Sequence, residues 1–450
     1  MAGVECLAAT HYIVPVNSNA QDPYTNWATA GTNIIDVVNA AQTNIAARVV
    51  WVTNGTYYPT NQIYITNELT FQSVNGRDVT ILDGANASTS RCAYFTSTST
   101  VFNGFTVTNY HTVGNDGALV GSIFLNCRFV SNATTHIGMN TGGRGTILMS
   151  AGGIVTNCIF KNNKTDSLGG GIYANSTVGV KILDCRFEGN EAVNGGACAF
   201  RQNTTISNCV IVNNIAGNNS SGGGLYITGT TNIYVLNCAI TGNVISGGTG
   251  KGGGVSVLSG SGTIKDCSII GNSLEKEGGG IYSAGDSVTN MIIRNCLIAR
   301  NRSTVTSGGG IWMTNGIIES CTIVSNYAAV AGGGVYIDGS GSGTNNIIYF
   351  NTAASAANFT NTAGNTGLNY CCVIPAVGGT GNTTNNPMLK NLAGGDYRLR
   401  MTSPCVNAGT NQPWMTNTVD LEGNTRILKT IVDMGTYETR IWQGTIYSVP

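Results

Sequence analysis

Eight cysteines recur along the middle of the chain at an almost constant interval, and this recurrence restricts the possible folds more than any other feature. The intervals are 31, 27, 24, 29, 29, 29 and 25 residues, and the cysteines are Cys127, Cys158, Cys185, Cys209, Cys238, Cys267, Cys296 and Cys321. An asparagine follows each of them five positions later, namely Asn132, Asn163, Asn190, Asn214, Asn243, Asn272, Asn301 and Asn326. The same spacing joins Gly104 to Asn109 and Asn346 to Asn351. A repeat of roughly 20 to 50 residues is typical of a solenoid.

A glycine-rich phrase lies between the cysteines. It reads Gly-Gly-Gly-Ile-Tyr at 169–173, and its variants begin at Gly195, Gly222, Gly252, Gly278, Gly308 and Gly332. Each unit therefore contains two short apolar runs and a glycine turn, and such runs rich in Ile, Val, Phe and Tyr are typical of strands. A unit this short cannot bury its own apolar side chains, so it must stack on its neighbours.

We therefore predict an all-β fold, a single-stranded right-handed parallel β-helix of about 10–12 coils. The right hand is expected because parallel crossovers are right-handed in almost all proteins. Coils of about 28 residues leave room for three strands each. With 62 glycines and only 8 prolines, the composition suits a chain that turns tightly and often.

The two recurring residues have different predicted roles. Cysteine is small and readily buried, so we place it inside the coil as a column of free thiols. Asparagine tolerates left-handed backbone angles, and stacked copies can form an amide ladder at one corner. Cys371 and Cys372 belong to neither column, and they either pair with each other or stay free.

The two ends of the chain have sequence patterns that differ from the repeats. Thr32 and Asn33 are plausible helix caps, and apolar residues at helical spacing follow them at Ile34, Val37, Val38 and Ala41. This predicts an N-terminal cap over residues 1–48 with a short amphipathic helix that closes the first coil. The β-helix is expected over 49–351. A C-terminal cap or anchor-like segment is expected over 352–450.

Composition excludes several classes of function. Lys plus Arg is 22 and Asp plus Glu is 22, so the balanced charge argues against a nucleic-acid-binding protein. No apolar stretch is long enough to cross a membrane as a helix. The four aspartates Asp166, Asp184, Asp266 and Asp286 are scattered, and no Gly-Lys-Ser/Thr follows the glycine runs. We expect no metal site and no cofactor.

An aromatic row is the first candidate binding feature. The fourth position of the glycine phrase is apolar and should point inward, so the fifth position should point outward. That fifth position holds Tyr173, Tyr226, Tyr282, Trp312 and Tyr336. A flat row of rings can pack against sugar rings. The alternative is that these tyrosines only fit a half-buried sheet surface.

Two groups of polar residues are the candidate catalytic features. The residues one and three positions after each cysteine should point outward, and there Arg128, Lys161, Arg186 and Glu188 collect on three successive coils. Such a cluster can neutralise a uronic-acid carboxylate and supply a base, or it can be an ordinary solvated ion-pair patch.

The second group is histidine-based and lies on neighbouring coils. Tyr110, His111 and His136 combine a histidine base with a tyrosine acid, which would suit β-elimination.

The repeats resemble those of known families. The N-C-x-[IF]-x-x-N and G-G-G-[IV]-[YW] phrases are similar to the β-helix repeats of pectin-lyase-like proteins and polymorphic outer-membrane proteins. The tail resembles the choice-of-anchor Q segment through the phrases that begin at Asn386, Gly394, Ser403, Asp420, Arg426 and Val432. This resemblance implies an exported bacterial protein, secreted or attached to the cell surface, although the chain shows neither an intact secretory signal nor an anchor.

Two functions follow, and the sequence leaves both open. The first is a non-catalytic surface or extracellular protein, such as an adhesin, that presents the aromatic row to a polysaccharide, a cell-surface glycan or a protein partner. The second is a polysaccharide lyase or glycoside hydrolase with a groove along the coils near residues 110–201.

Overall fold

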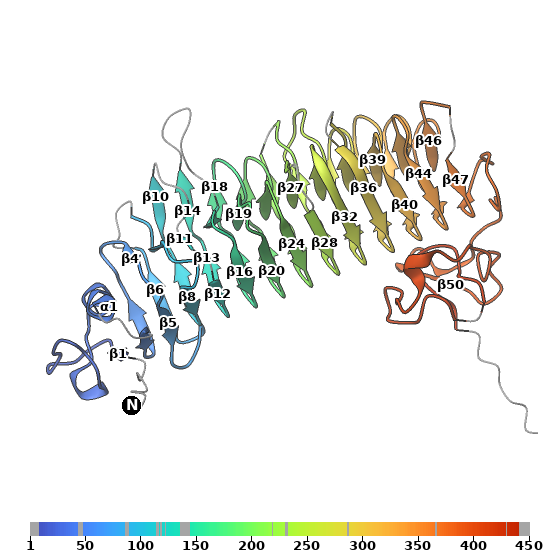
Figure 1. The fold of residues 1–450 in the computed structure, drawn as a ribbon. Coiled ribbons are helices and arrows are strands. Elements are labelled where there is room, and N and C mark those ends of the chain that lie inside the picture. Colours follow the sequence, from blue (N-terminus) through green and yellow to red (C-terminus); the bar gives the residue numbers. More distant parts are fainter. Residues whose placement is uncertain are drawn as a thin grey trace, which may run out of the picture.

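The chain forms one elongated stack of coils with a smaller cap folded back beneath its C-terminal end (Figure 1). This computed structural model describes residues 9–440 except 44–47, 86–89, 114–116, 118, 122, 136–144, 218, 230–232, 286–287, 365–366 and 429. Three parallel sheets run along the stack with 14, 13 and 12 strands, and a fourth has 9. The predicted right-handed parallel β-helix is confirmed.

We name the four sheets by their first and last strands. Sheet A runs from β1 (Ala9–Ile13) to β47 (Leu368–Asn369), and sheet B from β3 (Gly55–Tyr57) to β48 (Cys372–Val373). Sheet C runs from β4 (Ile63–Ile65) to β46 (Phe359–Asn361). The shorter sheet D runs from β10 (His111–Val113) to β42 (Tyr327–Ala328).

A typical coil has four strands, whereas the chain length per coil predicts three. One such coil consists of β28 (Ile233–Leu236), β29 (Ala239–Thr241), β30 (Val244–Ile245) and β31 (Val255–Val257), in sheets A, B, D and C. The additional strand is β30, which has only two residues. Left-handed backbone angles at Asn237, Gly242 and Gly252 make the corners between these strands.

The cysteine column lies inside the coil at the corner between sheets A and B. Cys238 Sγ lies 3.1 Å from the carbonyl oxygen of Leu236, and the backbone N–H of Cys238 donates to Cys267 Sγ at 3.4 Å. The thiol therefore forms hydrogen bonds with backbone polar groups at a tight corner, and it also fills apolar space inside the coil. All cysteines that the structure describes are buried, and none of these forms a disulfide.

Cys371 belongs to this column, so the prediction that it lies outside is wrong. The N–H of Asn346 donates to Cys371 Sγ at 3.3 Å, and the N–H of Cys321 donates to Asn346 Oδ1 at 2.9 Å. Asn346 thus takes the place of one cysteine between Cys321 and Cys371. Cys372 points to the outside of the coil, against the cap.

The asparagine column forms the predicted amide ladder at the corner between sheets B and D. Both the N–H and the side-chain amide of Asn243 donate to Asn272 Oδ1 at 2.9 Å, and Asn243 Nδ2 also donates to the carbonyl oxygen of Ile211 at 3.0 Å. The ladder continues without a break to Asn358. Every donor thereby bonds to the adjacent coil, which satisfies groups that are costly to bury alone.

Two details of the predicted asparagine column are wrong. The left-handed angle belongs to the residue before each ladder asparagine, as at Asn213 (φ 54°) and Gly242 (φ 64°). At the start of the ladder the corresponding residue is Tyr110 rather than Asn109, because the Tyr110 N–H donates to Asn132 Oδ1 at 3.2 Å.

The glycine phrase forms the corner between sheets D and C, where the backbone of the next coil lies very close. A Cβ atom placed on Gly223 would lie 2.2 Å from the carbonyl oxygen of Gly253. The backbone angle of Gly223 is ordinary, so its requirement for glycine is steric.

At the N-terminal end, α1 (Ile34–Gln42) is the predicted helix. Asn33 Oδ1 caps it by accepting from the Ile35 N–H at 2.9 Å, and the four predicted apolar residues are buried. The helix packs on β1, β2 (Arg48–Val52) and β4. β1 pairs with β2, so sheet A begins before the helix. That the helix closes the first coil stays a prediction.

The C-terminal cap covers the outside of sheet B over the last coils. β49 (Leu389–Asn391) and β50 (Asp396–Leu399) form its antiparallel sheet, and a short 3-10 helix follows at η2 (Pro413–Met415). Apolar side chains of the cap, including Leu399 and Met434, pack against Leu297 and Ile347 of sheet B. The cap is therefore joined to the coil stack by a hydrophobic interface.

We expect Asn243→Ala to destabilise the fold by about 3 kcal/mol. The change leaves the buried Asn214 N–H without its acceptor. It also removes the Asn243 amide that donates to Asn272 and Ile211, and each unsatisfied buried group costs roughly 1–3 kcal/mol. Urea unfolding measures the loss. Asn61→Ala, at an exposed position, is the control and should change stability by less than about 0.5 kcal/mol. Equal stability of both variants would contradict a structural role for the ladder.

We also expect Gly223→Ala to lower the melting temperature strongly or to prevent folding, because backbone atoms of the next coil occupy the position of the new Cβ. Gly217→Ala is the matched control. Its nearest atoms are 3.7 Å away, which is ordinary contact. Thermal unfolding followed by circular dichroism compares the two variants. A similar melting temperature for both would show that the corner can accommodate a Cβ atom.

Candidate functional site

The outward positions of sheet C form one row along the stack. In β35 (Ile281–Ser283), β39 (Ile311–Met313) and β43 (Val335–Ile337), Tyr282 lies opposite Trp312, and Trp312 lies opposite Tyr336. Their neighbours Ile281, Ile311 and Val335 are buried inside the coil. The predicted inward and outward alternation therefore holds in these strands.

The rings of this row stack on one another, which differs from the flat row that the sequence predicts. The ring centres of Tyr282 and Trp312 are 4.9 Å apart with planes inclined by 15°, and those of Trp312 and Tyr336 are 5.8 Å apart with planes inclined by 10°. The first spacing is close to the distance between strands, about 4.8 Å. The rings consequently cover each other's faces. Tyr282 is only 4% exposed, so the prediction that it is available to a ligand is wrong, whereas Trp312 and Tyr336 are partly exposed.

The two ends of this ring stack differ. Lys251 Nζ lies 4.7 Å from the ring centre of Tyr282 and 2.9 Å from its hydroxyl, so a cation covers the first ring. At the other end, Tyr336 lies opposite Thr360, whose short side chain provides no further ring. The outer face of the partly exposed Tyr336 ring is therefore the open end of the stack.

The remaining two residues of the predicted row lie apart from the ring stack. Tyr173 is fully buried in a cluster outside the coil with Val120, Leu148 and Ala199, so the prediction that it is available to a ligand is wrong. Tyr226 is partly exposed and lies between Ala199 and Ser256, so no ring stacks on it.

The sequence argument missed a second ring pair at the N-terminal end of the same row. Tyr64 of β4 and Tyr94 of β7 (Ala93–Phe95) stack with ring centres 5.6 Å apart, and the Arg91 guanidinium lies 5.3 Å from the Tyr94 ring centre. Tyr64 is 49% exposed. The alternation Ile-Tyr-Ile at 63–65 indicates an outward tyrosine. It was overlooked because no glycine triplet, by which the other strands of the row were identified, precedes it.

The charged residues after the cysteines lie on the outside of sheet B, where they form ion pairs. In β17 (Ile159–Lys161) and β21 (Arg186–Glu188), Glu188 binds Lys161 at 3.0 Å and Arg186 at 2.8 Å. In β13 (Arg128–Val130), Arg128 binds Asp78 at 2.7 Å. The four candidates therefore lie on neighbouring coils, and each has an opposite charge as its partner.

These pairs affect what the cluster can do chemically. Lys161 and Arg186 hold the pKa of the Glu188 carboxyl below its ordinary value. A general base that works near neutral pH needs a pKa close to that pH. Exposed pairs of this kind contribute little to stability. The cluster matches the solvated ion-pair patch that the sequence leaves open.

The histidine-based group does not form on the outside of the coil. Tyr110 is buried at the first position of the asparagine ladder, and burial raises the pKa of its hydroxyl well above the ordinary value. It cannot act as an acid on an external substrate, so that prediction is wrong. His111 is exposed and hydrogen-bonded to Thr135 Oγ1 at 2.9 Å. His136 lies outside the described residues.

The cap contains a buried polar network made by the tail phrases. Arg426 is fully buried, donates to the carbonyl oxygen of Gly435 at 3.1 Å and pairs with Glu438 at 3.2 Å. Asp420 accepts from the N–H groups of Asn424 and Glu438 at 2.8 Å. Across the described part of the chain, no cluster of three His, Cys, Asp or Glu residues could hold a metal ion.

Burial is the main influence on the titration of this network. It raises the pKa of Glu438 to about 8, although the nearby Arg426 guanidinium lowers it, and it also raises the pKa of Asp433. Burial therefore opposes ionisation of the Glu438 carboxyl, whereas the neighbouring Arg426 guanidinium favours it.

Two family models match parts of the coil stack. Residues 170–353 match the family described as "Right handed beta helix region", and residues 157–175 match the "Chlamydia polymorphic membrane protein (Chlamydia_PMP) repeat". The structure described as "Crystal structure of pectate lyase Pel9A" aligns over 96% of this chain and 98% of its own, with 14% identity and a TM-score of 0.39. No curated protein sequence matches the chain.

We expect Glu438→Gln to reduce the pH dependence of stability. A carboxyl whose pKa is higher in the folded than in the unfolded chain stabilises the fold at low pH, and this contribution is lost as the pH rises from about 4.5 to about 8. The fall in unfolding free energy between pH 5.5 and 8.5 should be about 3 kcal/mol smaller in the variant. Urea unfolding at both pH values measures it, and an unchanged slope would contradict the raised pKa.

Proposed function

From the premise that this chain is a right-handed parallel β-helix repeat protein, we propose that it is a non-catalytic surface or extracellular protein that binds glycans along the outside of sheet C. The ring stack of Tyr282, Trp312 and Tyr336 carries this proposal. The Trp312 indole and the Tyr336 phenol are partly exposed, and the outer ring face of Tyr336 is open. Sugar rings pack against such faces, while phenol hydroxyls bond to sugar hydroxyls.

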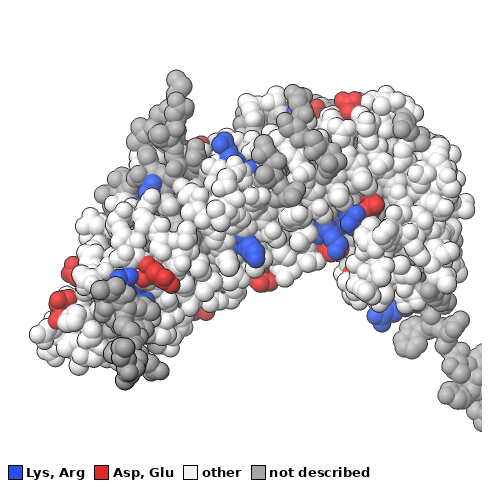
Figure 2. Space-filling model, viewed as in Figure 1, with Lys and Arg blue, Asp and Glu red and all other residues white. Residues whose placement is uncertain are grey.

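The low charge of the chain supports a neutral, polyhydroxylated ligand. Only 10% of the residues are charged, and most of the surface in Figure 2 is neither acidic nor basic. A glycan with many hydroxyls suits such a surface better than a nucleic acid, which needs many cations. Protein partners on the same side of the molecule are a further part of this proposal.

The location outside the cell is supported by the repeats themselves. The matched repeat carries the name of a membrane protein, and the β-helix match covers the central coils. Within the described ranges, no helix has both the length and the apolar character needed to span a bilayer. Secretion and attachment to a cell surface both fit this proposal.

The alternative of a polysaccharide lyase or glycoside hydrolase depends on the cluster of Lys161, Arg186 and Glu188. The observation in its favour is that these charges meet on neighbouring coils of one sheet. Against it, each charge is neutralised by a partner, and Tyr110 is unreachable from outside. We therefore prefer the binding function.

We expect Trp312→Ala and Tyr336→Ala to weaken glycan binding by about tenfold, because the first removes the middle ring that supports Tyr336 and the second removes the ring at the open end. Affinity electrophoresis against neutral and acidic polysaccharides measures binding. Tyr234→Ala is the control, since Tyr234 is 40% exposed but lies on sheet A. Its affinity should equal that of the unchanged protein.

Two results would contradict the proposal. One is full glycan affinity in both ring variants. The other is turnover: unsaturated or reducing-end product that forms with the unchanged protein and disappears in Lys161→Ala would establish the enzyme.

A further inference from the structure

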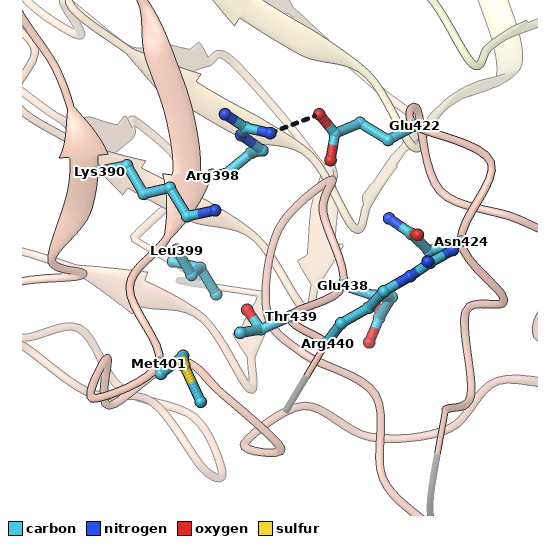
Figure 3. A pocket seen from close by; sticks show the side chains of 9 residues that line it. All are labelled: Lys390, Arg398, Leu399, Met401, Glu422, Asn424, Glu438, Thr439 and Arg440. Atoms are coloured by element: carbon cyan, nitrogen blue, oxygen red, sulfur yellow. Dashed lines mark hydrogen bonds and ion pairs between the residues drawn. The ribbon is translucent and has the colours of Figure 1, made fainter. Parts of the chain in front are cut away.

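The cap contains a pocket of about 600 Å³ that none of the features above uses (Figure 3). Its walls come from β49, β50 and the segments around residues 422–424 and 438–440. The lining residues are Lys390, Arg398, Leu399, Met401, Glu422, Asn424, Glu438, Thr439 and Arg440. This volume is ordinary for a site that binds a small molecule.

The acidic groups on and near the wall are already engaged. Arg398 binds Asp396 at 2.6 Å and Glu422 at 3.2 Å. Glu438 pairs with the buried Arg426.

The two aspartates behind the wall are held by backbone N–H groups. Asp433 accepts from Asn407 and Thr439 at 2.7 Å each, and Asp420 accepts from Glu422 and Asn424 at 2.8 Å each. These carboxylates are therefore satisfied within the cap and do not need the remaining cations of the pocket.

Two cations of the pocket have no such partner. Among the residues that the structure describes, neither the Lys390 ammonium nor the Arg440 guanidinium forms an ion pair with a carboxylate. Lys and Arg together number 22 in 450 residues, so two such side chains in one pocket stand out from the rest of the chain. Lys390 extends from β49 on one side of the pocket, and the Arg440 side chain on the other side runs toward Asn424, while Arg398 lies above Lys390 (Figure 3).

We propose that this pocket binds a tetrahedral oxyanion, the sulfate or phosphate ester group of an organic ligand. Several separate cations in the lining of one pocket suit an anion with more than two oxygens, whereas a planar carboxylate is matched by one arginine alone. The Asn424 amide and Thr439 hydroxyl add neutral donors, and Leu399 and Met401 provide an apolar wall for the organic part. The site is separate from sheet C and does not depend on glycan binding there.

The experiment is isothermal titration calorimetry with galactose 6-sulfate, galactose 6-phosphate, galactose and glucuronate. Inorganic sulfate and inorganic phosphate are titrated as well. The variants are Lys390→Gln, Arg440→Gln and their combination, all at the surface. Lys164→Gln is the matched control, because Lys164 is an exposed lysine of sheet D that pairs with Glu191 at 2.7 Å. Trp312→Ala tests independence from sheet C.

We expect one or both esters to bind at least tenfold more tightly than galactose and glucuronate, with the better ester identifying the natural anion. Each single variant should weaken this binding, and the combination should abolish it, while Lys164→Gln and Trp312→Ala leave it unchanged. An inorganic anion should bind more weakly than its ester.

The proposal is overturned if no ester binds, if glucuronate binds as tightly as the esters, or if the combined variant retains full affinity. It is also overturned if Trp312→Ala alone removes ester binding, since the ligand would then lie on sheet C.

Discussion

The bonding of each coil to the next is the interaction on which the rest of the structure depends. Strands of neighbouring coils pair in parallel register along all four sheets. At one corner, side-chain amides such as that of Asn243 also form hydrogen bonds to the next coil. Because an asparagine amide both donates and accepts, each copy needs another copy one coil away. The stack thereby fixes which side chains of the coils lie inside and which reach solvent, including those of the ring stack on sheet C.

Much of this arrangement could be predicted from spacing alone. The constant five-residue step between Cys238 and Asn243, repeated in each unit, places both residues at corners and identifies the strands between them. Spacing fails where the residue type changes. Asn346 replaces a cysteine and hides the link to Cys371, and Tyr110 replaces an asparagine beside the misleading Asn109.

The candidate sites were less predictable, because they depend on side-chain direction and on distant partners. The alternation of sheet C places Trp312 outside but does not reveal that its ring lies flat against that of Tyr282. Arg128 pairs with Asp78, which is 50 residues away in sequence. The tail phrases contain Asp420, Arg426 and Glu438, yet nothing in their order shows that they meet around one buried guanidinium.

One short segment of the cap connects several coils at once. The Thr436 hydroxyl donates to the carbonyl oxygen of Cys296, the Thr436 N–H donates to Thr322 Oγ1, and the Gly435 N–H donates to the carbonyl oxygen of Asn345. These three acceptors belong to three successive coils. A pulling force on the C-terminal end would therefore load those coils together, and they would have to detach as a block instead of peeling away singly. For a long protein exposed to shear, this clamp sets the mechanical limit at the cap.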